Sequence, residues 1–265
     1  MISVALTIAG SDPSGGAGLQ ADLKTFHQHG VYGASVVTLI TVQNTVRVSR
    51  VEVLDAALVR EQLDAVLADL PPDAVKTGAL GNADVVATVA SALARLRVPV
   101  VVDPVMVSKH GAPLVDERAR AAIATELLPR ATLVTPNVPE AIALSGRDVH
   151  DLASAREAAR AIAGLGARAV LVKGGHLEGP AVDVLFVDGR FELFESPRID
   201  SPHTHGTGCT YSAAITAWLS RGATLGVAVG RTKTWLTEAI RTPPGVGRGI
   251  GPVGHFAPLP TERER

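Results

Sequence analysis

The residues best suited to chemistry occupy positions 203–210, which read His-Thr-His-Gly-Thr-Gly-Cys-Thr and contain the chain's single cysteine. The backbone N–H groups of Gly206, Thr207 and Gly208 can turn toward one point. The apolar segment behind them predicts a helix whose dipole also favours an anion there. A cysteine at a helix N-terminus has a lowered pKa, so we expect Cys209 to accept a proton near neutral pH. An anion hole beside a base is what phosphoryl transfer to a hydroxyl group requires.

The same stretch permits other interpretations. His203, His205 and Cys209 are metal-ligand types at plausible spacing, but a closed zinc site needs four ligands and the chain has no second cysteine. Cys209 is also compatible with simple packing in a buried helix, which is common for free cysteines. A thiol hydrolase would use Cys209 as its nucleophile and His205 as its base.

A second glycine-rich segment, residues 10–22, reads Gly-Ser-Asp-Pro-Ser-Gly-Gly-Ala-Gly-Leu-Gln-Ala-Asp. Such a turn between a strand and a helix lets a ligand approach the backbone. Gly16, Gly18 and Ala21 fit the pattern G-x-G-x-x-A, which suggests a dinucleotide-dependent oxidoreductase as an alternative function. Against it, Asp12-Pro13-Ser14 lengthens the turn, and no acidic residue ends the next strand to bind a ribose. A plain turn that begins a helix also explains the segment, and the P-loop pattern is absent from the sequence.

Two polar side chains elsewhere end apolar runs and suit ligand binding. The carboxamide of Gln43 offers a donor beside an acceptor, which complements the ring nitrogen and exocyclic amine of an aminopyrimidine. Lys173 precedes two glycines and suits a phosphate counter-charge. Ordinary turn roles remain open for both, with Gln43 bonded to backbone and Lys173 solvated.

Three further polar residues suit a metal and its phosphates. Asp103 closes the run Val-Pro-Val-Val-Val-Asp, and a carboxylate at the end of a buried strand is costly unless it is paired or near a metal. Magnesium held beside phosphates is one such partner. Asn137 and Glu140 have the spacing of a helix N-cap and its N3 partner, so a capping box explains them as well as a magnesium or water site does.

Short Val, Ile, Leu and Ala runs alternate with helical patterns, and these elements must position the polar groups. Strands are expected at 3–10, 34–42, 48–54, 73–80, 98–105, 131–137 and 167–175, with a hairpin turning near Asp188-Gly189. Helices are expected at 18–30, 55–70, 82–96, 115–128, over much of 138–165, at 208–221 and at 224–241.

Strands that are apolar on both faces and alternate with helices predict an α/β fold, a three-layer α/β/α sandwich with a mostly parallel central sheet. In such sheets ligands bind beyond the carboxyl ends of the strands. Five strand ends are expected to meet there: Gly10-Ser11-Asp12, Gln43-Asn44-Thr45, Asp103-Pro104, Thr135-Pro136-Asn137 and Lys173-Gly174-Gly175-His176. We expect a single domain over 1–256 and a flexible tail over 257–265.

The composition excludes some function classes. Hydrophobic residues make up 46% of the 265 residues and charged residues 19%, which is a globular composition. The net charge of −1 argues against nucleic acid as a partner. One cysteine forms no internal disulfide, the first residues lack a signal peptide's basic start, and the uncharged runs are too polar to span a membrane. A soluble cytoplasmic protein is therefore expected.

The order and content of these motifs resemble a known family. Segments including ALTIAGSDPSGGAGLQADLKTF, VQNT, KTGALG, VVDPVMVSKHGAPL, TPNVPEA, VLVKGGH, HGTGCTYSAAI and GIGPVGHF are similar to the hydroxymethylpyrimidine/phosphomethylpyrimidine kinases of thiamine biosynthesis. These kinases belong to the ribokinase-like superfamily, and the resemblance runs from about residue 5 to 256.

The resemblance implies an ATP- and Mg²⁺-dependent kinase of 4-amino-5-hydroxymethyl-2-methylpyrimidine and of its monophosphate, and it implies a homodimer. A pyridoxal or pyridoxine kinase is the alternative within the kinases, because that ring also carries a hydroxymethyl group. By the same resemblance Cys209 stands where sugar kinases have an aspartate base. Pyrimidine binding is implied for Gln43, Gly10, Ala17 and Asp22, nucleotide binding for Lys173, Thr135 and Asn137, and magnesium binding for Asp103 and Glu140.

Three positions depart from the family pattern. His203 and Arg248 stand where the family often has asparagine and histidine, and His110 stands where a serine is usual. None of the three replaces a residue assigned to the chemistry. His110 and Arg248 are expected to affect phosphate handling, which bears on the second phosphorylation more than on the first.

Overall fold

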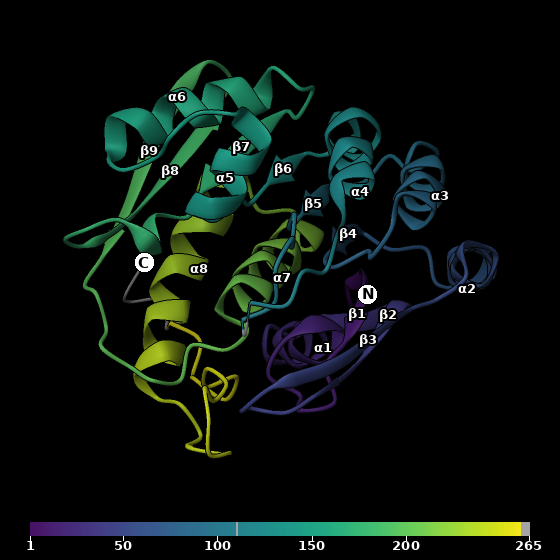
Figure 1. Ribbon diagram of the computed structural model, residues 1–265, viewed down its shortest axis with the longest axis horizontal. Helices are drawn as coiled ribbons and strands as arrows, with labels where there is room; N and C mark the ends of the chain where they lie inside the picture. Colours follow the sequence, from purple (N-terminus) through teal and green to yellow (C-terminus); the bar gives the residue numbers. More distant parts are fainter. Residues whose placement is uncertain (110, 261–265) are drawn as a thin grey trace.

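We describe a computed structural model of the chain, which covers residues 1–109 and 111–260. Its centre is a single twisted sheet, and within these residues the sheet has nine strands (Figure 1). Their order across the sheet is β3 (Val48–Val53), β2 (Tyr32–Gln43), β1 (Val4–Ser11), β4 (Ala74–Thr77), β5 (Val100–Val102), β6 (Leu133–Val134), β7 (Ala169–Val172), β8 (Ala181–Val187) and β9 (Arg190–Ser196). The neighbouring strands β2, β1, β4, β5, β6 and β7 run parallel, whereas β3, β8 and β9 pair antiparallel with their neighbours. The predicted mostly parallel sheet is confirmed.

Helices cover both faces of the sheet (Figure 1). One face carries α2 (Ala56–Asp69), α3 (Ala83–Leu93), α4 (Glu117–Ala122), α5 (Val138–Ser145) and α6 (Leu152–Ala163). The other face carries α1 (Gly18–Gln28), α7 (Thr207–Ser220) and α8 (Leu225–Arg241). This is the three-layer α/β/α sandwich that the sequence predicts.

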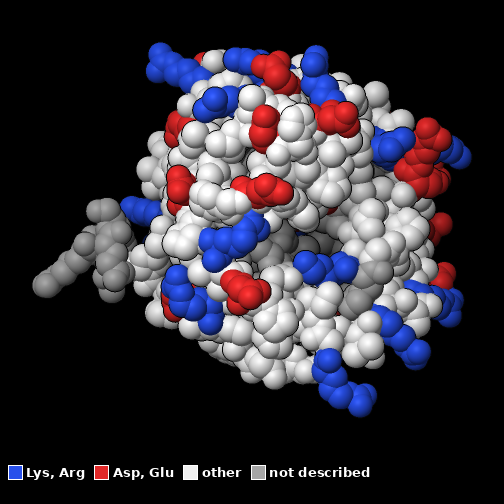
Figure 2. Space-filling model, turned by 60° about the vertical axis from the view of Figure 1, so that its left-hand side comes forward, with Lys and Arg blue, Asp and Glu red and all other residues white. Residues whose placement is uncertain are grey.

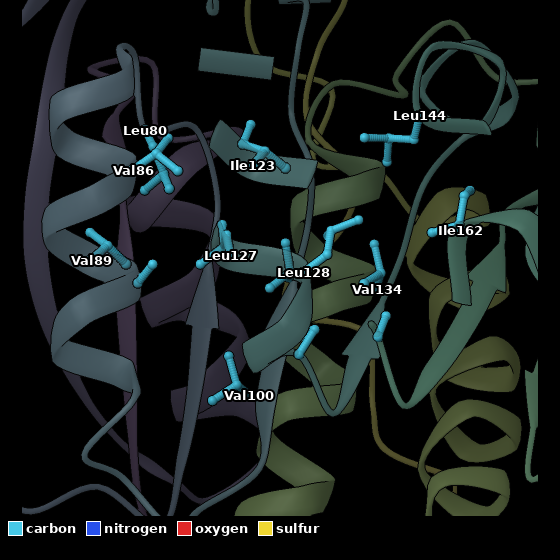
Figure 3. Packing of buried hydrophobic residues seen from close by; sticks show 14 of the residues in the cluster. Leu80, Val86, Val89, Val100, Ile123, Leu127, Leu128, Val134, Leu144 and Ile162 are labelled. Atoms are coloured by element: carbon cyan, nitrogen blue, oxygen red, sulfur yellow. The ribbon is translucent and has the colours of Figure 1, made fainter. Parts of the chain in front are cut away.

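Alternation along the central strands explains the two cores. Val100 and Val102 of β5 pack into the cluster beneath α2 to α6, while Val101 between them packs with α7 and α8. Successive side chains of a strand point to opposite faces, so a run of valines supplies both cores at once. Figure 3 shows the first core, where Val100 and Val134 from the sheet meet Leu127, Leu128 and their neighbours from the helices.

Some predicted boundaries differ from the structure. The predicted strands at 98–105 and 131–137 shorten to Val100–Val102 and Leu133–Val134, because the chain leaves the sheet at its polar ends. The helix predicted at 115–128 is α4 followed by a π-helical turn, Ile123–Leu127, and a short 3₁₀ turn, Leu128–Arg130. The hairpin is confirmed, with Asp188 and Gly189 at φ of 50° and 76°, as a type I′ turn requires.

The start of the predicted flexible tail is wrong. Ala257 is buried, and its carbonyl accepts hydrogen bonds from Gln28 Nε2 at 2.8 Å and from the Trp235 indole at 2.9 Å. These bonds join the C-terminal segment to α1 and α8, so the packed domain continues past residue 256. Residues 261–265 of the predicted tail lie outside the described residues. No helix in the described part of the chain is long and apolar enough to cross a membrane.

Candidate active site

A cavity of about 1100 Å³ lies at the carboxyl ends of the parallel strands. Its walls include Gly10 at the end of β1, Gln43 at the end of β2, Asp103 after β5, and Lys173 after β7. The start of α7 forms another wall. The face drawn in Figure 2 is hollowed, and Lys or Arg side chains lie beside the hollow. The topology therefore brings together residues that are far apart in the sequence, at the place where doubly wound sheets bind ligands.

The first turn of α7, from Gly206 to Cys209, has the features of an anion-binding site, which we call the anion seat. Gly206 has a φ of 76°, and a Cβ there would lie 1.8 Å from the carbonyl oxygen of Gly16, so only glycine fits. The N–H of Thr207 makes a long bond of 3.4 Å to Thr204, whereas those of Gly208 and Cys209 have no acceptor among the described residues. Free N–H groups at a helix start and the dipole behind them favour a bound anion.

Lys173 and Asp103 stand beside this anion seat. Lys173 Nζ lies 3.0 Å from Asp103 Oδ1, and a Cβ built on Gly208 would lie 3.2 Å from the same Nζ. Burial lowers the pKa of Lys173, but the charges of Asp103 and Glu140 outweigh burial and raise it overall. Burial likewise raises the pKa of Asp103, and Lys173 and Lys76 bring it below its usual value. The alternative of a solvated lysine at a turn is therefore wrong for Lys173.

Asn137 and Glu140 form the capping box that begins α5. The Asn137 side chain accepts from the Glu140 N–H at 2.9 Å, and Glu140 Oε2 accepts from the Asn137 N–H at 2.8 Å. Burial nevertheless raises the pKa of Glu140 to about 7, with Lys173 opposing and Asp103 adding to the rise. Both residues line the cavity, so the structural role and a role in the site coexist.

The acidic residues fit magnesium better than zinc. The described residues contain no group of three His, Cys, Asp or Glu side chains placed to hold a metal ion, which removes the zinc hypothesis for His203, His205 and Cys209. Asp103 and Glu140 supply carboxylate oxygens at one side of the cavity. Magnesium is commonly bound by one or two carboxylates together with phosphate oxygens and water, and this pair of residues matches that pattern.

The expected low pKa of Cys209 is wrong in this structure. Burial raises the pKa of the thiol to about 12, and although Lys76 lowers it, the charges of Asp103 and Asp22 raise it further. Desolvation of the thiolate therefore outweighs the helix N-terminus, and Cys209 carries its proton at neutral pH. The residue still lines the cavity at the end of the anion seat, where the sequence places it.

The loop after β1 and the loop before α7 are joined by a buried hydrogen bond between His205 and Asp12. His205 Nε2 lies 2.8 Å from Asp12 Oδ2, and the same carboxylate accepts from the N–H groups of Ser14 and Ala17. Burial raises the pKa of Asp12, but His205 and Ser14 outweigh it and hold the pKa at about 2. The contact holds Gly206 close to Gly16 and Ala17 at the edge of the cavity, a function that sequence reasoning missed for Asp12.

The residues expected to bind the pyrimidine are only partly brought together. Gln43, Gly10 and Ala17 line the cavity. Asp22 does not: it is fully buried and accepts from Lys76 Nζ at 2.8 Å, so Lys76 lies between it and the cavity. The prediction that Asp22 lines the pocket is wrong, because α1 points that carboxylate under β1 and β4. Lys76 was missed, although its position in the motif KTGALG marks it as a lysine inside a buried strand.

On the other side of the cavity, Thr135 does not reach the surface. It is fully buried beneath the cavity, and its hydroxyl points at Asp103 Oδ1 from 3.4 Å. Thr135 therefore lies behind Asp103 and not on the cavity wall, and its contact with the cofactor stays a prediction. Sequence reasoning missed a polar cluster in this wall: Asp183 accepts from the Tyr211 hydroxyl at 2.7 Å and from Lys233 Nζ at 2.8 Å. Only the tertiary fold joins these residues of β8, α7 and α8.

The sequence matches the family model for phosphomethylpyrimidine kinase over residues 12–254. The chain belongs to the phosphomethylpyrimidine kinase family. Members of the family are phosphotransferases, so the oxidoreductase and thiol hydrolase hypotheses are wrong for this kinase. The hydroxymethylpyrimidine/phosphomethylpyrimidine kinase of Synechococcus elongatus is 47% identical over 260 residues, which are 97% of this chain and 99% of that protein.

A second relative is longer than this kinase. The thiamine biosynthesis bifunctional protein ThiED of Geobacter sulfurreducens is 50% identical over 262 residues, which are 98% of this chain. The chain spans 54% of that bifunctional protein, so the likeness concerns one part of it.

Solved structures confirm the ribokinase-like fold of this kinase. An ADP complex of Bacillus subtilis pyridoxal kinase has a TM-score of 0.90 at 40% identity, covering 97% of this chain and 98% of that one. A phosphomethylpyrimidine kinase from Clostridium difficile 630 has a TM-score of 0.80 at 41% identity, covering 90% of this chain and 99% of that one. Both kinds of kinase share this sheet and these helices, so the fold does not decide between their substrates.

Two of the positions that depart from the family pattern, His203 and Arg248, are not part of the described cavity wall. Arg248 is exposed, and neither Arg248 nor His203 lines the cavity. The expectation for His110 falls outside the described residues. The predicted effect of Arg248 on phosphate handling stays a prediction.

Proposed function

We propose that this kinase transfers the γ-phosphoryl group of ATP to 4-amino-5-hydroxymethyl-2-methylpyrimidine and then to its monophosphate, giving the pyrophosphate used in thiamine synthesis. The observation that carries the proposal is the anion seat at Gly208 and Cys209, with Lys173 beside it and Gln43 in the same cavity. The names of the relatives from Synechococcus and Geobacter support this choice of substrate and pathway.

The pyrimidine half of the cavity is assigned to the ends of β1 and β2. The Gln43 carboxamide is the group that would pair with the ring nitrogen and exocyclic amine of the substrate. Gly10 lines this half at the end of β1, and its lack of a side chain leaves room for the buried Leu39. Ala17 presents a small side chain at the start of α1.

The nucleotide half is assigned to the region between Lys173 and α8. Solved complexes of Staphylococcus aureus pyridoxal kinase with an ATP analogue have the same fold, at a TM-score of 0.88 and 35% identity. Asp103 and Glu140 would hold magnesium, which supplies neutralisation of phosphate charge when bound. Lys173 and Asn137 lie at the same wall and would contact the phosphates.

Cys209 is assigned to the substrate hydroxyl. It occupies the third residue of α7, directly beside the free N–H groups, so a hydroxyl oxygen held there faces the transferring phosphoryl group. As a thiol it orients the hydroxyl group; as a thiolate it accepts the proton that leaves when the new P–O bond forms.

Product analysis by mass spectrometry tests the proposal. Incubation with the hydroxymethylpyrimidine and ATP should give the monophosphate and then the pyrophosphate, and their absence would contradict the assignment. Cys209→Ala should reduce kcat by about 100-fold or more with little change in KM, the range expected for loss of a general base. Cys209→Ser, which replaces the thiol by a hydroxyl group of similar size, is the matched control and should retain the orienting role only. Near-normal kcat in Cys209→Ala would remove Cys209 from the chemistry.

Pyridoxal is the second candidate substrate. It is favoured by the likeness to pyridoxal kinases of known structure, which reaches a TM-score of 0.90. Pyridoxal has no exocyclic amine to pair with Gln43, so kcat/KM should be higher for the pyrimidine. An ADP-release assay with both substrates side by side decides between them, and Gln43→Ala should reduce turnover of the pyrimidine more than that of pyridoxal.

We also propose that the kinase acts as a homodimer in the cytoplasm. Three exposed apolar side chains lie close together in the sequence: Ile40 and Val42 of β2, and Val46 in the turn after it. A second copy of the chain would cover this apolar patch. Light scattering after size exclusion should give twice the mass of one chain. Val42→Glu should shift that mass to one chain, whereas Leu193→Glu, at an exposed position on β9, should not.

A further inference from the structure

A fully buried lysine lies at the floor of the cavity, and the function proposed above gives it no part. Lys76 in β4 has no exposed surface, and its Nζ donates to Asp22 Oδ2 at 2.8 Å. The same oxygen accepts from the Thr7 hydroxyl at 2.6 Å. Lysine is almost never fully buried, and apolar side chains in place of a buried pair often stabilise a fold equally well. The position of this pair therefore points to a use in the site.

Lys76 and Cys209 lie on elements that pack against each other. Helix α7, which carries Cys209 in its first turn, packs against β4, which carries Lys76. Lys76 and Cys209 both line the cavity, whereas Asp22 lies behind Lys76. An ammonium group has three N–H donors. Asp22 accepts from it, and no other hydrogen-bond acceptor for Lys76 is found among the described residues.

Four charged groups act on the sulfur of Cys209. Lys76 from β4 has the largest effect of any charge and favours the thiolate, while Asp103 after β5 and Asp22 from α1 oppose it. Lys173 after β7 also interacts with the thiolate charge. Burial lowers the pKa of Lys76, but Asp22 and Cys209 outweigh burial and raise it to about 12, so the ammonium stays charged. Burial raises the pKa of the Asp22 carboxyl, and Lys76 and Thr7 act against that rise.

We propose that Lys76 is a positioning residue of the reaction centre: its ammonium stabilises negative charge on the sulfur of Cys209, and Asp22 holds that ammonium in place. The transfer step uses the minor thiolate form of Cys209, which the charge of Lys76 favours: the hydroxymethyl O–H bond breaks and its proton passes to that sulfur. The substrate oxygen bonds to the γ-phosphorus of ATP, and the bond from that phosphorus to the β,γ-bridging oxygen breaks, releasing ADP. The inference rests on the proposed function at one point, which is that the Cys209 thiolate accepts the proton of the substrate.

The single cysteine makes a direct test possible, because alkylation by iodoacetamide reports on the Cys209 thiolate alone. Below the pKa, each unit of rise in that pKa reduces the alkylation rate tenfold. The rate at pH 8.5 should fall at least tenfold in Lys76→Met. It should fall by a smaller factor in the double variant Lys76→Met/Asp22→Asn, because that variant also removes the opposing charge of Asp22. Lys76→Arg should retain most of the wild-type rate. Circular dichroism and thermal melting identify the variants that fold.

Thr7→Val is the matched control, since it removes a hydrogen bond to Asp22 without changing charge. Its alkylation rate should stay within twofold of wild type. An unchanged rate in the folded double variant overturns the inference, and so does an equal fall in Thr7→Val, because packing would then explain both.

Turnover separates this inference from the proposed function. A fall in both alkylation and kcat, with both KM values kept, supports the two together. A fall in alkylation with normal kcat supports the charge role of Lys76 and removes the thiolate from the reaction. If the wild-type chain has no pyrimidine kinase activity, the proposed function is contradicted, but the alkylation result still stands.

Discussion

Replacing Gly208 by alanine should make the protein more stable and less active. Gly208 is the second residue of α7, and its φ lies outside the left-handed region, so alanine fits the backbone. Alanine in a helix is favoured over glycine by roughly 0.5–1 kcal/mol, which sets the upper range of the stability gain. The new methyl group would lie 3.2 Å from Lys173 Nζ and 3.9 Å from Asp103 Oδ2.

The activity loss follows from the same contact. A distance of 3.2 Å is within the range at which an anion oxygen would accept from Lys173, so the methyl group occupies a position for a phosphate oxygen. Loss of one charge-assisted hydrogen bond costs about 1.5–3 kcal/mol, which corresponds to a roughly 10- to 150-fold reduction in kcat/KM. Lys173 cannot move away freely, because Asp103 holds it at 3.0 Å.

Urea denaturation and an ADP-release assay measure the two effects on the same samples. Gly230→Ala is the matched control: it lies inside α8, its Cβ would make an ordinary contact of 3.4 Å with Phe194, and it does not line the cavity. It should gain similar stability with unchanged kcat/KM. If Gly208→Ala is folded and its kcat/KM lies within twofold of wild type, the anion seat has been misplaced.

Three further predictions concern stability, pH and metal. Asp183→Ala leaves the Lys233 ammonium and the Tyr211 hydroxyl without their acceptor, so the free energy of unfolding in urea should fall by about 3–5 kcal/mol; a loss under 1 kcal/mol would show that the cluster is not structural. Burial lowers the pKa of His29 to about 4 from the usual 6.5 of a histidine. Because the unfolded chain then binds more protons at His29, the contribution of His29 to stability should be constant above pH 6.5 and fall between pH 6.5 and 4. His255, whose pKa burial also lowers to about 4, adds to this fall, whereas Glu140, whose pKa is raised to about 7, opposes it. His29→Gln should flatten that fall, and an unchanged slope in chemical denaturation would contradict the assignment. EDTA should abolish ADP release and excess Mg²⁺ should restore it, whereas turnover that survives EDTA would remove Asp103 and Glu140 as magnesium ligands.

The local patterns of the sequence predicted the elements well. Valine-rich runs flanked by polar residues predict strands buried on both faces, and β5 with Val100 to Val102 is such a strand. Gly206 predicts a backbone conformation that other residues rarely adopt at the start of α7, and the structure shows a φ of 76° there. These features depend on residues near each other in the chain, so the sequence carries the information directly.

The partners of buried charges could not be predicted in the same way. The sequence placed Asp22 in the pocket, but it faces Lys76, which lies 54 positions away in the chain. It also predicted a low pKa for Cys209 from the helix N-terminus alone, whereas burial beside Asp103 and Asp22 raises that pKa to about 12. Desolvation depends on every group packed around a side chain, and local sequence does not specify those groups.

By itself, the sequence determined the kinds of groups in this protein and the order in which strands and helices present them. The glycine turns, the lysine before Gly174 and the family motifs all belong to that part. Only the tertiary structure decided which of these groups reach the cavity and which support it from below. The physical reason is that a parallel sheet aligns the ends of strands distant in sequence, and the packed layers behind those ends set the charge and solvation of each side chain.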